Sequence, residues 1–359
     1  MKEDKREMVY EALRFKEPTL LPYHIDVLAP VAEKLKTHFA TDDIDAAMGN
    51  FLRWLSMEKQ WQELPGGPGR LPIPAEGGQA ARSPRRHARM GGRALDEFAV
   101  IWRTTGVNRG YVVEHPLKEP SLKDYEFPQF DYEKKLGYFP FAVERGKGHF
   151  LVAWVGDLWE RAHFLRGLDH LLSDLLLHPA FVHELLQRLE EIILRNMDAM
   201  SRYAVDAFFL SDDYGLQENL MMRPATWREF IKPHLVNIFR KGHQLGRICF
   251  LHSCGNVSEI VPDLIEVGLD VLHPIQPEAM DIAGLKKEYG SDLTFYGGLG
   301  TQQVLVRGSP GEVREEVKRL AEVMGQGGGY ILGPGISIQH DVPLGNLLAL
   351  IEEASLLAK

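Results

Sequence analysis

Short apolar runs alternate with helical segments over residues 149–359. Six runs have the length and composition of buried strands: 149–155, 207–211, 247–252, 269–273, 293–296 and 330–332. Between them, apolar residues recur at helical spacing over 179–203, 225–243 and 309–324. The last of these segments begins with a capping-box pattern of Ser309, Pro310 and Glu312. Such strand–helix repetition predicts a parallel sheet covered by helices.

The N-terminal part of the chain has a weaker pattern. Residues 2–15 predict a short helix that Pro18 must end, 20–26 an extended segment, and 28–60 further helix. Residues 65–93 hold seven Gly, five Pro and six Arg with a single acidic residue, and show no periodicity. This composition predicts a flexible loop, with a phosphate-gripping segment as the alternative.

Two architectures fit the alternation, an open doubly wound sheet and a closed (β/α)8 barrel of TIM type. Polar or glycine-containing clusters follow several strands, as at 211–215, 252–255 and 333–335. Polar residues at the ends of many strands are typical of the catalytic face of a barrel. No G-x-G-x-x-G opens a helix after an early strand, so a dinucleotide-binding open sheet loses support. We therefore expect one barrel domain over 1–359, with an N-terminal helical extension and loop excursion over 1–100.

Charge and composition exclude several classes of function. Lys and Arg number 41 against 50 Asp and Glu, so the formal net charge is −9. A net-acidic chain is a poor candidate for binding nucleic-acid phosphates. No apolar stretch approaches the ~18 residues of a membrane span, and the N-terminus lacks the apolar region of a secretory signal. With only two cysteines, Cys249 and Cys254, we expect a cytoplasmic protein without disulfides.

His252 and Cys254 form the most specific candidate site. They follow a predicted strand, and residues two apart on an extended chain point to the same side. Imidazole and thiolate are typical zinc ligands, and Gly255 permits the sharp turn into the next helix. The alternative is a buried cysteine beside a hydrogen-bonded histidine. Cys249 has the opposite parity and is expected in the core.

A catalytic zinc site needs a third protein ligand. The candidates are His340, Asp213, Glu218 and His273, of which we place His340 in the metal site with His252 and Cys254. The alternative interpretation of His340 is an exposed loop histidine that binds no metal. Asp213 and Glu218 close the strand 207–211 and are our candidate catalytic carboxylates, as a ligand, an orienting partner of His252 or a general acid. The alternative interpretation of the Asp-Asp-x-Gly segment is that its aspartates only cap the turn.

The order of these motifs resembles the uroporphyrinogen decarboxylase superfamily. The resemblance rests on four segments: Asp-Asp-x-Gly at 212–215, Phe-Leu-His-Ser-Cys-Gly at 250–255, Tyr-Gly-Gly at 296–298 and Gly-Gly-Gly-Tyr-Ile-Leu-Gly-Pro-Gly at 327–335. The opening over 11–23 and the tail over 341–354 are similar too. Within the superfamily, the chain looks most like the corrinoid-linked methyltransferase branch. The resemblance implies a (β/α)8 barrel.

The resemblance also implies cofactors and partners. Methyltransferases of this branch bind zinc through the H-x-C pair and a later cysteine, and exchange a methyl group with a corrinoid carried by a partner protein. Carried over, His252 and Cys254 match, but the later cysteine falls at Ile336, so His340 is the substitute. A small methyl donor or thiol acceptor would complete the reaction. A homodimer is left open.

Two other functions stay open from the sequence. The first is a metal-free decarboxylase-type lyase acting on a tetrapyrrole, although the arginines that grip such a substrate in true uroporphyrinogen decarboxylases are missing from 23–27. The second is a non-catalytic, ligand-binding member of the superfamily, which the apolar residue at Ile336 favours.

Overall fold

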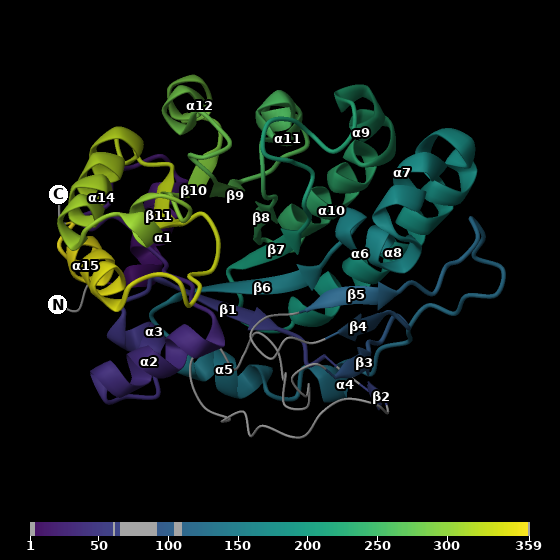
Figure 1. The fold of residues 1–359 in the computed structure, drawn as a ribbon, viewed down its shortest axis with the longest axis horizontal. Helices are drawn as coiled ribbons and strands as arrows, with labels where there is room; N and C mark the ends of the chain where they lie inside the picture. The colour runs from purple at the N-terminus through teal and green to yellow at the C-terminus, as the bar shows by residue number, and fades with distance from the viewer. Residues whose placement is uncertain (1–3, 60–61, 65–91, 104–109, 358–359) are drawn as a thin grey trace.

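The computed structural model describes residues 4–59, 62–64, 92–103 and 110–357. Its centre is a curled parallel sheet of seven strands in chain order (Figure 1). The strands are β1 (Leu52–Ser56), β6 (Phe150–Gly156), β7 (Ala207–Ser211), β8 (Ile248–His252), β9 (Val271–Ile275), β10 (Thr294–Leu299) and β11 (Tyr330–Pro334). All six predicted strands are confirmed, with shifts of a few residues at their ends.

Residues 22–27 lie beside β11 without forming an eighth strand. Parallel bridges join Tyr23 to Leu332 and Val27 to Ile338, while Tyr23 O also accepts the amide of Phe51, just before β1. Pro22 has no N–H to donate, which limits the ladder at this edge. The structure therefore shows an α/β fold with a curled seven-stranded sheet, where the sequence predicts eight strands.

Helices cover the outer face of the sheet (Figure 1). Those between the strands of the C-terminal part include α6 (Trp159–Arg166), α7 (Leu168–Leu177), α8 (Pro179–Met200), α9 (Pro224–Phe230), α10 (Lys232–Gln244), α11 (Val261–Glu266), α12 (Ile282–Tyr289), α13 (Val304–Arg307) and α14 (Pro310–Met324), and α15 (Leu344–Ser355) follows the last strand. The capping box of α14 is confirmed, because the Ser309 and Glu312 side chains each bond the other's backbone amide. None of the described helices has the length and hydropathy needed to cross a bilayer.

The N-terminal part corrects one prediction. Helices α1 (Lys5–Leu13), α2 (Ala29–Phe39) and α3 (Ile44–Ala47) precede β1, so residues 28–60 are not helical throughout. β1 has only five residues, and its sequence Leu-Arg-Trp-Leu-Ser is neither a continuous apolar run nor a strict alternation of apolar and polar residues. So short a segment, placed between helical patterns, is easily taken for part of a helix.

The predicted helix over 225–243 is two helices. The break falls at Ile231, between α9 and α10. Pro233 explains it, because its ring would clash with the carbonyl of Glu229 in a continuous helix. Pro233 is instead tolerated in the first turn of α10.

A second, antiparallel sheet has no counterpart in the sequence-based prediction. It contains β2 (Gln62–Leu64), β3 (Arg93–Leu95), β4 (Ile101–Arg103) and β5 (Tyr111–Glu114), and is followed by α4 (Tyr132–Lys135) and α5 (Phe139–Arg145). Most of the predicted flexible loop, 65–91, lies outside the described residues. Arg161 of α6 ties the two sheets together, since its guanidinium bonds Asp157 after β6 and Asp96 after β3.

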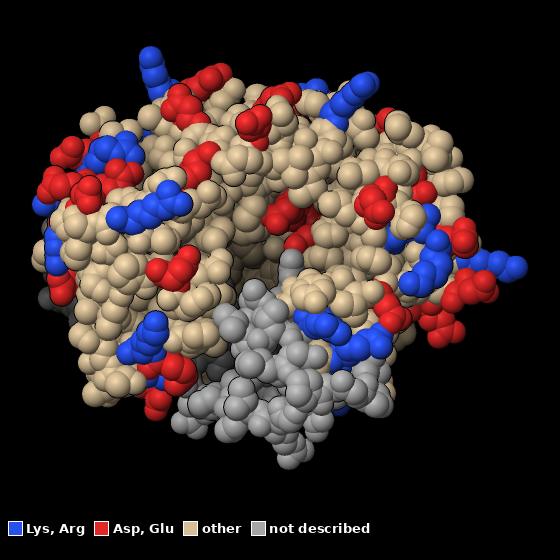
Figure 2. All heavy atoms as spheres, in the orientation of Figure 1, with Lys and Arg blue, Asp and Glu red and all other residues tan. Residues whose placement is uncertain are grey.

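One face of the molecule carries charges of both signs (Figure 2). The described Lys and Arg residues on it are interspersed with Asp and Glu, so they form no continuous basic surface among themselves. A hollow lies near the centre of the view, with acidic side chains beside it.

Candidate metal centre

His252 and Cys254 bring a nitrogen and a sulfur donor together where β8 ends. His252 Nε2 lies 3.4 Å from Cys254 Sγ, as the two-residue spacing predicts. The residue between them points the other way: Ser253 is fully buried, and its hydroxyl accepts the amide of Tyr214 at 2.9 Å. This bond joins the loop after β8 to the loop after β7.

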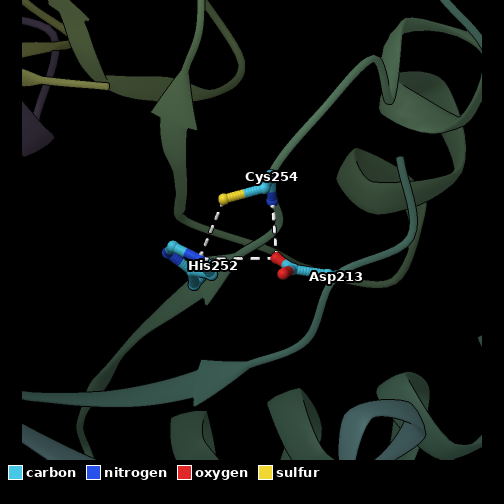
Figure 3. A group of neighbouring side chains, drawn as sticks. All are labelled: Asp213, His252 and Cys254. Atoms are coloured by element: carbon cyan, nitrogen blue, oxygen red, sulfur yellow. Dashed lines mark hydrogen bonds and ion pairs between the residues drawn. The ribbon is translucent and has the colours of Figure 1, made fainter. Parts of the chain in front are cut away.

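Asp213 adds an oxygen donor from the loop after β7. Its Oδ1 lies 3.4 Å from His252 Nε2 and accepts the amide of Cys254 at 2.8 Å. One ligand atom from each of the three residues lies within 4.8 Å of the others, and all three residues are half-buried. Figure 3 shows the oxygen, nitrogen and sulfur atoms facing one another from these two loops.

The adjacent Asp212 has a different role from Asp213. It is fully buried and accepts the amides of 158–160, at the start of α6, together with the hydroxyl of Tyr214. Burial raises the pKa of Asp212 to about 8, against the opposing effect of these hydrogen bonds. Asp212 therefore holds α6 on the sheet, while Asp213 remains directed at His252.

The three donors favour a positive charge at their centre. Burial disfavours the charged form of His252, but the adjacent Cys254 and Asp213 hold the pKa of the ring well above its ordinary value. A protonated imidazole satisfies this field, and so would a cation held between the donors.

Aromatic rings from neighbouring strands surround His252. The ring of His273, on β9, lies 5.0 Å from it between centroids, and Tyr296 of β10 lies 4.3 Å beyond. Phe209 packs against both histidines. His24 Nδ1 lies 2.7 Å from the Tyr296 hydroxyl, and the indole of Trp54 donates to the same nitrogen at 3.3 Å. These rings form an apolar wall with imidazole groups set into it.

Two predicted site residues lie apart from this group. His340 and Glu218 are both exposed, and neither belongs to the two groups of metal-compatible side chains found among the described residues. Ile336, half-buried after β11, offers no donor atom.

The second metal-compatible group lies at the other end of β8. It contains His243, Cys249 and Asp270. Cys249 is 2% exposed, as expected for a core residue, and its sulfur packs so closely on α10 that a Cβ on Gly242 would lie 2.4 Å away. The Asp270 carboxylate accepts the amide of Cys249 and contacts His243. These contacts account for the group as packing.

Gln276 is a site residue that the sequence did not indicate. It follows β9, is 8% exposed, and its Oε1 accepts the amide of Gly255 at 2.6 Å. The loop carrying Cys254 is thus held from both neighbouring strands, through Asp213 on one side and Gln276 on the other. A lone glutamine after a strand gives no sequence signal for this contact.

A sequence model of the uroporphyrinogen decarboxylase (URO-D) family matches residues 110–356, which is more than half of the chain. The chain belongs to the uroporphyrinogen decarboxylase family. The site described above lies within the matched part.

Relatives with two different activities resemble the chain. A methylcobamide:CoM methyltransferase (MtaA) of Methanosarcina barkeri is 27% identical over 161 residues, 45% of this chain and 44% of that protein. A uroporphyrinogen decarboxylase of Methylococcus capsulatus is 24% identical over 239 residues, 62% of this chain and 65% of that protein. The chain thus spans less than two thirds of either relative.

A solved structure supports the fold over its whole length. A methyltransferase from Methanosarcina mazei superposes with a TM-score of 0.67, covering 98% of both chains at 16% identity. At this identity, the likeness concerns the fold alone.

Proposed function

We propose that the chain is a zinc-dependent methyltransferase that moves a methyl group to or from a corrinoid carried by a partner protein. The observation that carries the proposal is the convergence of His252 Nε2, Cys254 Sγ and Asp213 Oδ1 at the carboxyl ends of β7 and β8. Functional sites of folds built from parallel strands lie at this end of the sheet.

The donor set fits zinc in chemistry, and the two distances from His252 Nε2 fit it in size. Zinc takes nitrogen, sulfur and carboxylate ligands at about 2.0 to 2.3 Å, so tetrahedral ligand atoms lie roughly 3.3 to 3.7 Å apart. Nε2 of His252 lies 3.4 Å from both Cys254 Sγ and Asp213 Oδ1. Three protein ligands leave one position for a substrate, as in catalytic zinc sites.

Asp213 takes the place of the third ligand in this proposal. The sequence-based assignment gave that place to His340, which is exposed and outside the donor group, while Glu218 is exposed on the loop after β7. We therefore assign ion binding to His252, Cys254 and Asp213, and give His340 and Glu218 no part in it.

When bound, zinc would lower the pKa of a thiol acceptor, or act as a Lewis acid toward a methoxy or amine donor. The residues of the chain would balance the charge of the ion and shield the site from water. Asp213 and Cys254 compensate the positive charge, and the rings of Phe209, Trp54 and Tyr296 exclude water from one side of the site. A low dielectric at this wall strengthens the attraction between the donors and a cation.

For the methyl donor and acceptor, the proposal draws on one of the relatives. The M. barkeri protein is named for methylcobamide and CoM, which supports a corrinoid on one side of the reaction and a thiol acceptor on the other. We propose a corrinoid protein as the partner on this basis.

A decarboxylase function has support from the second group of relatives. A tetrapyrrole carries several carboxylates, which need cationic partners. Residues 23–27, which lie beside β11, contain no arginine and carry Asp26. The donor group at Asp213 would repel carboxylates, so these observations favour methyl transfer.

Metal content tests the proposal directly. Wild type, His252→Ala/Cys254→Ala and the exposed control His340→Ala are each loaded with zinc, freed of unbound ion and measured by mass spectrometry. We expect roughly one zinc per chain in wild type and in the control, and loss in the double variant. Wild type without zinc would contradict the proposal.

Methyl transfer is then assayed with methylcobalamin and a small thiol. The visible spectrum of the corrinoid reports loss of the methyl group. We expect turnover by the zinc-loaded wild type and none by the double variant. A decarboxylase would instead release carbon dioxide from a tetrapyrrole with or without zinc.

A further inference from the structure

The ring of His273 forms a hydrogen bond with the ring of His252, the proposed metal ligand. The two residues are register partners on the parallel strands β8 and β9. Their side chains point to the same side of the sheet, and Nδ1 of one lies 3.0 Å from Nδ1 of the other. The distance is that of a hydrogen bond.

A hydrogen bond between two Nδ1 atoms requires one of them to carry the proton and the other to accept it. His252 Nε2 is the atom that faces Cys254 and Asp213. A metal held there takes the lone pair of Nε2, so the proton of a neutral His252 ring sits on Nδ1. His273 Nδ1 is then the acceptor, and the proton of the neutral His273 ring sits on Nε2.

The packing around His273 fixes the direction of this acceptor. Its ring lies between Phe209, at 5.8 Å, and Tyr296, at 4.3 Å between centroids. Its backbone carbonyl accepts the amide of Ser253 at 2.7 Å, which holds the chain between His252 and Cys254 against β9. The ring of His273 therefore contacts the ring of His252, and its backbone holds Ser253 in place.

We infer that His273 is a positioning residue, which fixes the tautomer and orientation of His252 for metal binding through its Nδ1 lone pair. The inference rests on the proposed zinc site but assigns no ligand role to His273. Outer partners of this kind typically contribute about 10- to 100-fold in metal affinity.

Two substitutions separate the acceptor from the volume of the side chain. His273→Phe keeps a ring between Phe209 and Tyr296 but removes the acceptor. His273→Asn loses ring volume but places an amide oxygen near the former Nδ1 position. Zinc affinity is measured by competition with a chromophoric chelator for the wild-type protein and both variants, with circular dichroism as the control for folding.

We expect zinc affinity to fall about 10- to 100-fold in His273→Phe and to recover most of that loss in His273→Asn. In zinc-loaded wild type, nitrogen-15 chemical shifts should show His252 protonated at Nδ1 and His273 at Nε2. A purely structural role predicts the opposite order, with the smaller asparagine more damaging.

The outcomes distinguish this inference from the proposed function. Wild type that binds zinc, with a folded His273→Phe of unchanged affinity, overturns the positioning role and leaves the zinc site standing. A His273 ring that carries its proton on Nδ1 in the zinc-loaded protein would also overturn the positioning role and leave the zinc site standing. Wild type that binds no zinc overturns the proposed site and this inference together.

Discussion

Gly255 and Gly215 bring the loops after β8 and β7 into backbone contact. A Cβ on Gly255 would lie 2.4 Å from the carbonyl carbon of Gly215, and Gly255 has φ of +79°. Only glycine satisfies both the close approach and the left-handed backbone. The contact sets the distance between Asp213 on one loop and Cys254 on the other.

Gly255→Ala should therefore weaken zinc binding as well as stability. The left-handed backbone costs about 1 to 2 kcal/mol, and the clash must separate the loops. Gly246→Ala is the matched control, because Gly246 has φ of +68° but open space around its Cβ position. Urea unfolding and zinc titration of both variants check this. Equal zinc affinity in the two would show that the loop contact does not hold the site.

The adjacent aspartates should separate stability from metal binding. Asp213→Asn weakens the oxygen donor and should lower zinc affinity with little effect on unfolding. Asp212→Ala leaves the amides of 158–160 buried without their acceptor, which should cost about 3 kcal/mol of unfolding free energy. Zinc titration and chemical denaturation measure the two effects. A loss of affinity in Asp212→Ala alone would reverse the assignment.

The sequence predicted the sheet better than the site. Apolar runs located six of the parallel strands because buried strands of such a sheet are continuous hydrophobic segments. The four-stranded antiparallel sheet escaped prediction because its strands have only three or four residues each. Such short segments carry too little periodicity to recognise.

Local spacing also explains which site residues could be found. His252 and Cys254 share one strand end, so alternation alone places them on one side. The choice among Asp213, His340 and His273 depends on how different loops meet. That is decided by contacts such as Gly215 with Gly255, and by the register of β8 against β9, which one sequence does not report.

Arg161 should hold the antiparallel sheet against the parallel one. Its guanidinium is buried and bonds Asp96 and Asp157 at 2.9 Å each. Arg161→Met leaves the buried carboxylate of Asp157 and the largely buried one of Asp96 without their cation, which should cost about 3 kcal/mol. The exposed pair of Arg188 with Glu191 is the control, since Arg188→Met should cost about 0.5 kcal/mol or less. Thermal unfolding of both variants measures the difference, and equal melting temperatures would contradict it.

His149 should make the protein sensitive to mild acid. Burial, with Arg53 and Lys5 nearby, lowers the pKa of His149 to about 4, and its buried Nδ1 has no hydrogen-bond partner among the described residues. The unfolded chain binds a proton near pH 6.5, before the folded protein does. Stability from this residue is therefore complete above pH 6.5 and is lost as the pH falls toward 4.

His149→Gln should remove this part of the acid sensitivity. Allowing for the solvent that reaches the half-buried ring, wild type should lose about 1 kcal/mol between pH 7 and pH 5 through His149. The variant should lose that much less over the same interval. His38→Gln, at an exposed position on α2, is the matched control for the exchange of a histidine for a glutamine. Urea denaturation at both pH values measures the difference. Parallel curves for wild type and His149→Gln would show that the folded protein holds the His149 proton as readily as the unfolded chain.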